Sequence, residues 1–220
     1  MKIKSFLVAA ALLLCGMTTH ASDMIGKNNI QLSSDLMTPE ALWAMGRIGT
    51  AASSPDGKLV VYQVSYYSVK LNKSHTVLYI QPAKSGQKPT LLTTDDKSES
   101  DPAWIDNGTR IAFLRNGQIW SMKADGTDRR QMTDSKTDIE GFRFSPDGSK
   151  VILIKSLPYH GSIQKNPDDL PLASGRLVTD MNYRHWDHYV ESIAHPFVAN
   201  VENGKINDSL RRHRAAGLEP

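Results

Sequence analysis

The sequence has almost no cysteine, little net charge and no hydrophobic run long enough to cross a membrane. Its single cysteine, Cys15, lies in the N-terminal apolar segment, so the remainder of the chain cannot form an internal disulfide. The formal net charge is only +3 over 220 residues, and the excess of basic residues lies at the two ends. A nearly neutral middle excludes the basic surface of a nucleic-acid-binding protein and of a protein bound to acidic lipid.

The N-terminus is typical of a secretory signal peptide. Lys2 and Lys4 precede an apolar run over residues 6–14, and the small residue Ala21 provides a cleavage site. Cys15 suggests a lipoprotein as the alternative, but the large residue before it disfavours lipid attachment. The sequence therefore predicts cleavage after Ala21 and a periplasmic or secreted protein without a membrane anchor.

A short phrase that occurs three times is the most informative pattern in the rest of the sequence. Each copy is a tight turn containing Asp and Gly, followed by an apolar strand. The glycines Gly57, Gly108 and Gly148 lie 51 and 40 residues apart, which is close to the length of one propeller blade. The repeat predicts an all-β fold, namely a partial β-propeller of about three to four antiparallel blades with TolB-like or WD-like repeats.

The residues of the repeated turns are expected to be structural, without a binding role. Asp accepts hydrogen bonds from backbone amides two residues on, and Gly adopts the left-handed conformation that such turns need. The pairs are Asp56 and Gly57, Asp106 and Gly108, and Asp147 and Gly148.

The patterns divide the chain into a signal peptide (1–21), a lead-in with one short helix (22–50), a partial propeller (51–208) and a tail (209–220). Thr38 and Pro39 predict the start of the helix, because Thr caps helices and Pro suits the first turn. We expect Leu42, Met45 and Ile48 to share the helix face that packs on the first blade.

Strand signals place the blades at residues 51–94, at 101–133 and from 139 onward. Three strands are evident in each of the first two blades, and the segment before each repeated turn supplies a fourth. After residue 156 the pattern breaks into an excursion rich in proline, glycine and aspartate. Strand signals resume over residues 196–201, before an Asn203-Gly204 turn, and we interpret them as the outer hairpin of a fourth blade.

Two stretches near the C-terminus are more specific than the repeats, which TolB-like and other propellers share. Residues 183–191 read YRHWDHYVE, and residues 195–200 read HPFVAN. Over roughly residues 37–207 the chain resembles the N-terminal propeller of bacterial dipeptidyl peptidase V-type enzymes. The resemblance extends to acylaminoacyl peptidases, which also belong to the prolyl oligopeptidase family of serine peptidases.

The resemblance implies that an α/β-hydrolase domain with a Ser-Asp-His triad follows the propeller. The 220 residues contain no Gly-x-Ser-x-Gly pattern, which marks the nucleophile of such a domain, so no residue is assigned a catalytic role. We expect this domain to be missing and the chain alone to be inactive. The residues after Asp208 show no strand pattern, and we favour a frameshift or premature stop over an incompletely recorded sequence.

The resemblance also implies that the propeller admits short peptides and holds their free N-terminus. The residues expected to do so are aromatic and charged: Tyr183, Arg184, Trp186, Asp187 and Glu191. A carboxylate at an aromatic edge can pair with a peptide ammonium, and such a bond contributes about 1.5–3 kcal/mol. The structural alternative is that Arg184 pairs with Asp187 or Glu191 while Trp186 fills space in the blade.

No cofactor is implied, and metal binding is not expected. His185 and His188 suggest a metal site, but the sequence offers no clear third ligand with fitting spacing. The sequence thus predicts the substrate-gating propeller of an exported dipeptidyl-peptidase-type serine exopeptidase. The alternative is a TolB-like periplasmic binding or scaffolding propeller without enzymatic activity, which would not account for residues 183–187.

Export gives the first testable prediction. Expression with the native N-terminus in a Gram-negative bacterium should yield a mature protein that begins at Ser22, because signal peptidases cleave after a small residue. The change Ala21→Arg should leave the precursor uncleaved. Mass spectrometry of the periplasmic and cytoplasmic fractions measures both outcomes, and an unprocessed wild-type chain confined to the cytoplasm would contradict the prediction.

Overall fold

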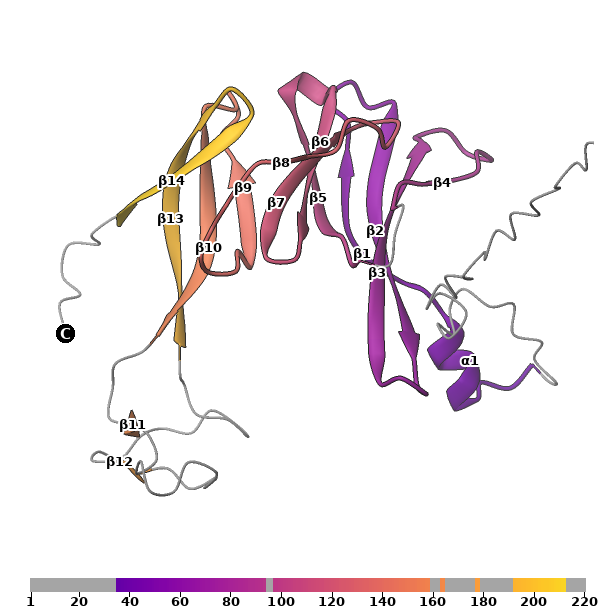
Figure 1. Cartoon of the computed structure of the whole chain (residues 1–220). Helices are drawn as coiled ribbons and strands as arrows, with labels where there is room; N and C mark the ends of the chain where they lie inside the picture. The colour runs from indigo at the N-terminus through magenta and orange to yellow at the C-terminus, as the bar shows by residue number, and fades with distance from the viewer. Residues whose placement is uncertain (1–34, 94–96, 159–162, 165–176, 179–191, 213–220) are drawn as a thin grey trace, which may run out of the picture.

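The computed structural model describes residues 35–93, 97–158, 163–164, 177–178 and 192–212. Within them one short helix, α1 (Pro39–Ala44), precedes three antiparallel sheets of four strands each, which stand side by side in Figure 1. Each of these sheets is one blade. A two-stranded pair, β11 (Ile163–Gln164) and β12 (Leu177–Val178), lies outside the blades.

In every blade, strands that are consecutive in the sheet pair antiparallel. Blade 1 consists of β1 (Arg47–Ser53), β2 (Leu59–Ser68), β3 (Lys73–Pro82) and β4 (Thr90–Leu91). Blade 2 consists of β5 (Ser100–Ile105), β6 (Arg110–Arg115), β7 (Gln118–Lys123) and β8 (Arg130–Gln131). Blade 3 consists of β9 (Gly141–Phe144), β10 (Lys150–Pro158), β13 (Ser192–Glu202) and β14 (Lys205–Arg212).

The predicted all-β fold of four-stranded blades is confirmed, and the segment before each repeated turn does supply a strand. The strands run from residue 47 to residue 212, beyond the limits of 51 and 208 drawn from the sequence.

The hairpin predicted as part of a fourth blade belongs to blade 3 instead. β13 pairs with β10 along the full length of β10, and β14 pairs with β13. The cause is packing: Val151 and Leu153 lie opposite Ala199 and Phe197, and all four side chains are buried in one apolar cluster. The excursion after residue 158 is therefore an insertion between the second and third strands of blade 3.

The helix forms where it was predicted, but the expected apolar face does not pack on the blade. Leu42 and Met45 are 48% and 49% exposed, and Ile48 lies in β1 with 71% of its surface exposed. The helix has only six residues, so it is too short to present residues spaced over two turns. Trp43 makes the contact instead, since its ring meets that of Tyr67 in β2 edge-on at 5.3 Å between centroids.

The first and third repeated turns have the geometry that their sequence predicts. In the first turn, Asp56 accepts hydrogen bonds from the Ser54 hydroxyl at 2.6 Å and from the Lys58 amide at 3.1 Å, while Gly57 has a φ of +70°. The third turn repeats this pattern around Asp147. These bonds, with the serine hydroxyl as the largest contribution, lower the pKa of each aspartate to about 2.

The middle turn is built differently, from three successive residues in the left-handed region. Asp106, Asn107 and Gly108 have φ values of +49°, +54° and +84°. A Cβ atom on Gly108 would lie 2.8 Å from Cδ of Pro55 in the first turn. Only glycine therefore allows the turns of blades 1 and 2 to approach this closely.

Two apolar clusters join the three blades, and β6 contributes to both. Ile111 and Phe113 pack toward blade 1, whereas Ala112 and Leu114 pack toward blade 3, because successive strand residues point to opposite faces. Buried residues that complete the blade 1–2 cluster are Val61, Leu78, Ile80, Leu92 and Met122. Those that complete the blade 2–3 cluster are Ile105, Ile119, Met132, Ile139, Val151, Leu153, Phe197, Ala199 and Ile206.

A buried carboxylate also joins blade 1 to blade 2. Glu99, just before β5, has a fully buried side chain and pairs with Arg115 of β6 at 2.9 Å and with Arg129, just before β8. The Thr93 hydroxyl of blade 1 donates to the same carboxylate at 3.2 Å, and Arg129 also donates to the Leu92 carbonyl at 3.0 Å. Both carboxylate oxygens are thus bonded, which offsets the cost of burying the charge.

We predict that Glu99→Ala lowers the free energy of unfolding by about 3 kcal/mol, because it leaves two largely buried arginines without their carboxylate. The exposed Glu140, changed to Ala, is the matched control and should alter stability by less than about 0.5 kcal/mol. Urea denaturation of the full chain, followed by tryptophan fluorescence, measures both variants. Trp104 is a suitable probe, since its Nε1 donates across the blade interface to the Ala52 carbonyl at 3.0 Å. Equal losses in the two variants would contradict the prediction.

Candidate functional site

The predicted peptide-binding residues lie outside the described residues. They are Tyr183, Arg184, Trp186, Asp187 and Glu191, and the two histidines considered for a metal, His185 and His188, lie outside as well. The strands that flank this segment are described, and Pro158 of β10 is paired with Ser192 of β13. The excursion therefore leaves and rejoins blade 3 at one end of its strands. In Figure 1 this end and α1 both lie on the lower side of the molecule.

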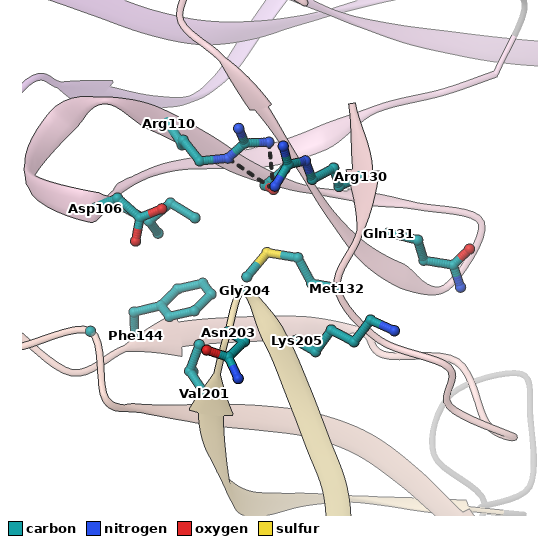
Figure 2. Close-up of a pocket in the computed structure, with 13 residues that line it drawn as sticks. Asp106, Arg110, Arg130, Gln131, Met132, Phe144, Val201, Asn203, Gly204 and Lys205 are labelled. Carbon is teal, nitrogen blue, oxygen red and sulfur yellow. Dashed lines mark hydrogen bonds between the residues drawn. The ribbon is translucent and has the colours of Figure 1, made fainter. Parts of the chain in front are cut away.

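A groove of about 670 Å³ opens between blades 2 and 3 at the opposite end of the strands (Figure 2). Its walls come from the β5–β6 turn, the start of β8, the β9–β10 turn and the β13–β14 turn. The lining residues are Ile105, Asp106, Arg110, Ser121, Arg130, Gln131, Met132, Phe144, Gly148, Val201, Asn203, Gly204 and Lys205.

The floor of the groove is apolar and is held by the contact between the two blades. Met132 is 4% exposed, and the half-buried Phe144 and Val201 flank it from blade 3. The backbone amide of Ile206 in β14 donates to the carbonyl of Met132 at 2.8 Å, so a main-chain hydrogen bond crosses from one blade to the other. This bond sets the distance between the outer strands on either side of the groove.

A charged cluster forms the blade 2 wall of the groove. Arg110 donates through Nη1 to the Asp128 carboxylate at 2.8 Å and through Nη2 to the Asp128 carbonyl at 2.7 Å. Its Nε and Nη2 also donate to the buried Ser121 hydroxyl, at 3.3 and 3.1 Å. Arg130 donates through Nε to the other Asp128 oxygen at 2.8 Å. These bonds hold the pKa of Asp128 below its ordinary value, and the bond from Arg110 makes the largest contribution.

Three further charges line the groove and are available to a ligand. Asp106 and Lys205 are exposed, and within the described residues neither charged group has a hydrogen-bond or ion-pair partner. The Arg130 side chain is 67% exposed, and its bond to Asp128 uses only Nε. Figure 2 shows Asp106 and Lys205 on opposite sides of the Met132 side chain.

Sequence reasoning located the turns of this groove but not the groove itself. Gly148 and the Asn203-Gly204 turn were recognised as turn residues, and Asp106 was given only a structural role. The Arg110–Asp128 pair has no sequence signal, because Arg110 begins β6 while Asp128 lies in the connection between β7 and β8, and the two meet only when the sheet forms. Among the described residues, no three His, Cys, Asp or Glu side chains gather as a metal site requires, and no helix has the length and apolar character of a membrane span.

Comparison with known proteins gives clear relatives, although no protein-family model matches the chain. It is 39% identical over 178 residues to dipeptidyl-peptidase 5 of Porphyromonas endodontalis and 39% identical over 210 residues to dipeptidyl-peptidase 5 of Porphyromonas gingivalis. These alignments cover 79% and 93% of this chain but only 26% and 29% of the relatives. The likeness to dipeptidyl peptidases is confirmed, and the chain spans little more than a quarter of their length.

The fold comparison agrees with the sequence comparison. Acylaminoacyl peptidase of Pyrococcus horikoshii superimposes with a TM-score of 0.51 at 15% identity, over 75% of this chain and 25% of that one. At this identity the likeness concerns the fold alone.

The charged wall gives a prediction about pH. The pKa of Asp128 is lowered mainly by Arg110, so Arg110→Gln should raise it toward the ordinary value. A lowered pKa in the folded state contributes stability above the unfolded pKa of about 3.9, and this contribution is lost as the pH falls through the folded value. The variant should therefore lose less stability than the wild type on acidification below about pH 4.

Carboxyl-carbon NMR titration measures the pKa of Asp128 directly. The exposed Lys123→Gln change at the end of β7 is the control and should leave this titration unchanged. An Asp128 titration that is identical in wild type and Arg110→Gln would show that the pair does not form.

Proposed function

We propose that this chain, a relative of the dipeptidyl-peptidase 5 proteins over one part of their length, is the substrate-gating propeller of a serine exopeptidase. The observation that carries the proposal is the 39% identity to two such peptidases over most of this chain. The reaction would be removal of dipeptides from peptide N-termini by acyl transfer through a serine. We assign that chemistry to an α/β-hydrolase part and assign substrate selection to the blades.

The architecture suits a gate. Blades 1 and 2 are joined by buried apolar residues and by the Glu99 network, which gives a stiff wall rather than a mobile lid. The excursion lies in the sequence between β10 and β13, and its two ends, Pro158 and Ser192, are paired at one end of blade 3. We place Asp187 and Glu191, within the excursion, against the free ammonium of the substrate. Short peptides are then the natural partners, and the N-terminal segment would direct export to the periplasm or the medium.

A chimera tests the proposal. The aligned segment of Porphyromonas gingivalis dipeptidyl-peptidase 5 is replaced by residues 37–207 of this chain, and hydrolysis of a dipeptidyl-coumarin substrate is measured. If residues 37–207 have the same function as the segment they replace, the chimera should still release dipeptides and should not cleave an N-acetylated substrate. A folded chimera that lacks activity, or that cleaves both substrates equally, would contradict the proposal.

The same chimera tests the ammonium-binding residues. Asp187→Ala should raise KM by about tenfold, since it removes a charge-assisted bond to the substrate, and kcat should change less. The exposed Asp134→Ala is the matched control. An unchanged KM in Asp187→Ala would remove that residue from the binding site while leaving the assignment of the propeller intact.

A further inference from the structure

The groove between blades 2 and 3 offers charges of both signs to a ligand. Asp106 follows β5, the first strand of blade 2, whereas Arg130 and Lys205 begin β8 and β14, the last strands of their blades. Between the two sets lies the apolar floor around Met132 and Phe144. A molecule in this groove meets the carboxylate of Asp106, the apolar floor, and the cations Arg130 from blade 2 and Lys205 from blade 3. Arg110 also lines the groove, but it is bonded to Asp128.

Asp106 differs from the aspartates of the other two repeated turns. The carboxylates of Asp56 and Asp147 accept hydrogen bonds from hydroxyl and amide groups of their own turns. The middle turn is closed by backbone instead, since the Asp106 carbonyl accepts from the Thr109 amide at 3.1 Å and from its hydroxyl at 2.8 Å. The residue two positions before Asp106, where the other two turns have a serine, is Trp104, which has no hydroxyl. The Asp106 carboxylate is therefore left for a partner from outside the turn.

The two cations are also prepared for a ligand. Arg130 donates through Nε to Asp128, which restrains the side chain and leaves the two terminal nitrogens to donate hydrogen bonds to an anion. Lys205 lies directly after the tight Asn203-Gly204 turn, whose residues have φ values of +52° and +72°. The main-chain bond from Ile206 to Met132 holds the start of β14 close to β8, so Arg130 of blade 2 and Lys205 of blade 3 face the groove from its two sides.

We propose that this groove binds a short zwitterionic peptide, namely a dipeptide with apolar side chains. Its ammonium pairs with Asp106, its carboxylate with Arg130 and Lys205, and its side chains lie on Met132 and Phe144. A ligand with a single charge would leave the groove charges of one sign unpaired, whereas a zwitterion satisfies both. The volume of about 670 Å³ lies within the usual range of small-molecule sites.

The identification of the dipeptide as the natural ligand rests on the proposed function, in which dipeptides are the product. The binding chemistry itself does not. The groove lies at the opposite end of blade 3 from Pro158 and Ser192, between which the excursion leaves and rejoins the blade.

Isothermal titration of the full chain with three probes tests the proposal: Ala-Leu, N-acetyl-Ala-Leu and Ala-Leu amide. Ala-Leu should bind, and each capped form should bind about tenfold more weakly because it lacks one charge. For the Asp106→Asn variant, Ala-Leu and N-acetyl-Ala-Leu should bind with equal affinity, because the partner of the ammonium has been removed. For the Lys205→Gln variant, the loss of affinity from Ala-Leu to Ala-Leu amide should be smaller than for the wild type.

Two exposed residues of the loop at the other end of β8 serve as controls, Asp134→Asn and Lys136→Gln, and neither should change the affinity. Circular dichroism confirms that the variants are folded, and all changed residues are exposed. Absence of Ala-Leu binding at millimolar concentration, or binding that ignores the caps and the substitutions, would overturn the proposal. A failure to bind Ala-Leu does not bear on the dipeptidyl-peptidase activity of the chimera, and an inactive chimera does not bear on dipeptide binding. The two proposals therefore fail separately.

Discussion

The buried carboxylate of Glu99 is the interaction on which the arrangement of blades 1 and 2 depends. A charge without water is costly, and here two arginines and a threonine hydroxyl from three separate segments must converge to compensate it. The geometry of that convergence orients the start of β5 and the approach to β8 against the end of blade 1. Apolar contacts alone tolerate sliding between two sheets, whereas these directional bonds do not.

The consequences of this network reach the groove through one pair of neighbouring residues. Arg129 and Arg130 are adjacent, and adjacent residues entering a strand point to opposite faces. Arg129 reaches back to Glu99 at the interface with blade 1, so Arg130 must face the interface with blade 3. The position of a cation in the groove is thus a by-product of an ion pair on the other side of the same sheet. Blade 2 transmits geometry in this way because β6 is buried on both faces.

The sequence was most informative where the physics is local. The repeated turns, the strands after them and the cap of the helix follow from residues within a few positions of one another, and the structure contains all of them. The fourth blade was wrong because strand signals over residues 196–201 do not say which strand they pair with. That choice depends on Val151 and Leu153 finding Ala199 and Phe197 across an insertion of more than thirty residues. The groove was missed for the same reason, since it exists only between blades.

The three copies of the repeated turn show how a structural motif can acquire a chemical role. A turn that closes through its aspartate side chain has no carboxylate left to bind a ligand. The same hydrogen bonds lower the pKa values of Asp56 and Asp147. A turn that closes through three left-handed residues keeps its side chain, at the cost of strain that Asn107 and Gly108 reduce. The serines two positions before Asp56 and Asp147 have their counterpart in Trp104, and the middle turn has one residue more between its aspartate and its glycine. Departures from a repeat therefore point to function more directly than the repeat does, because the repeat already accounts for the fold.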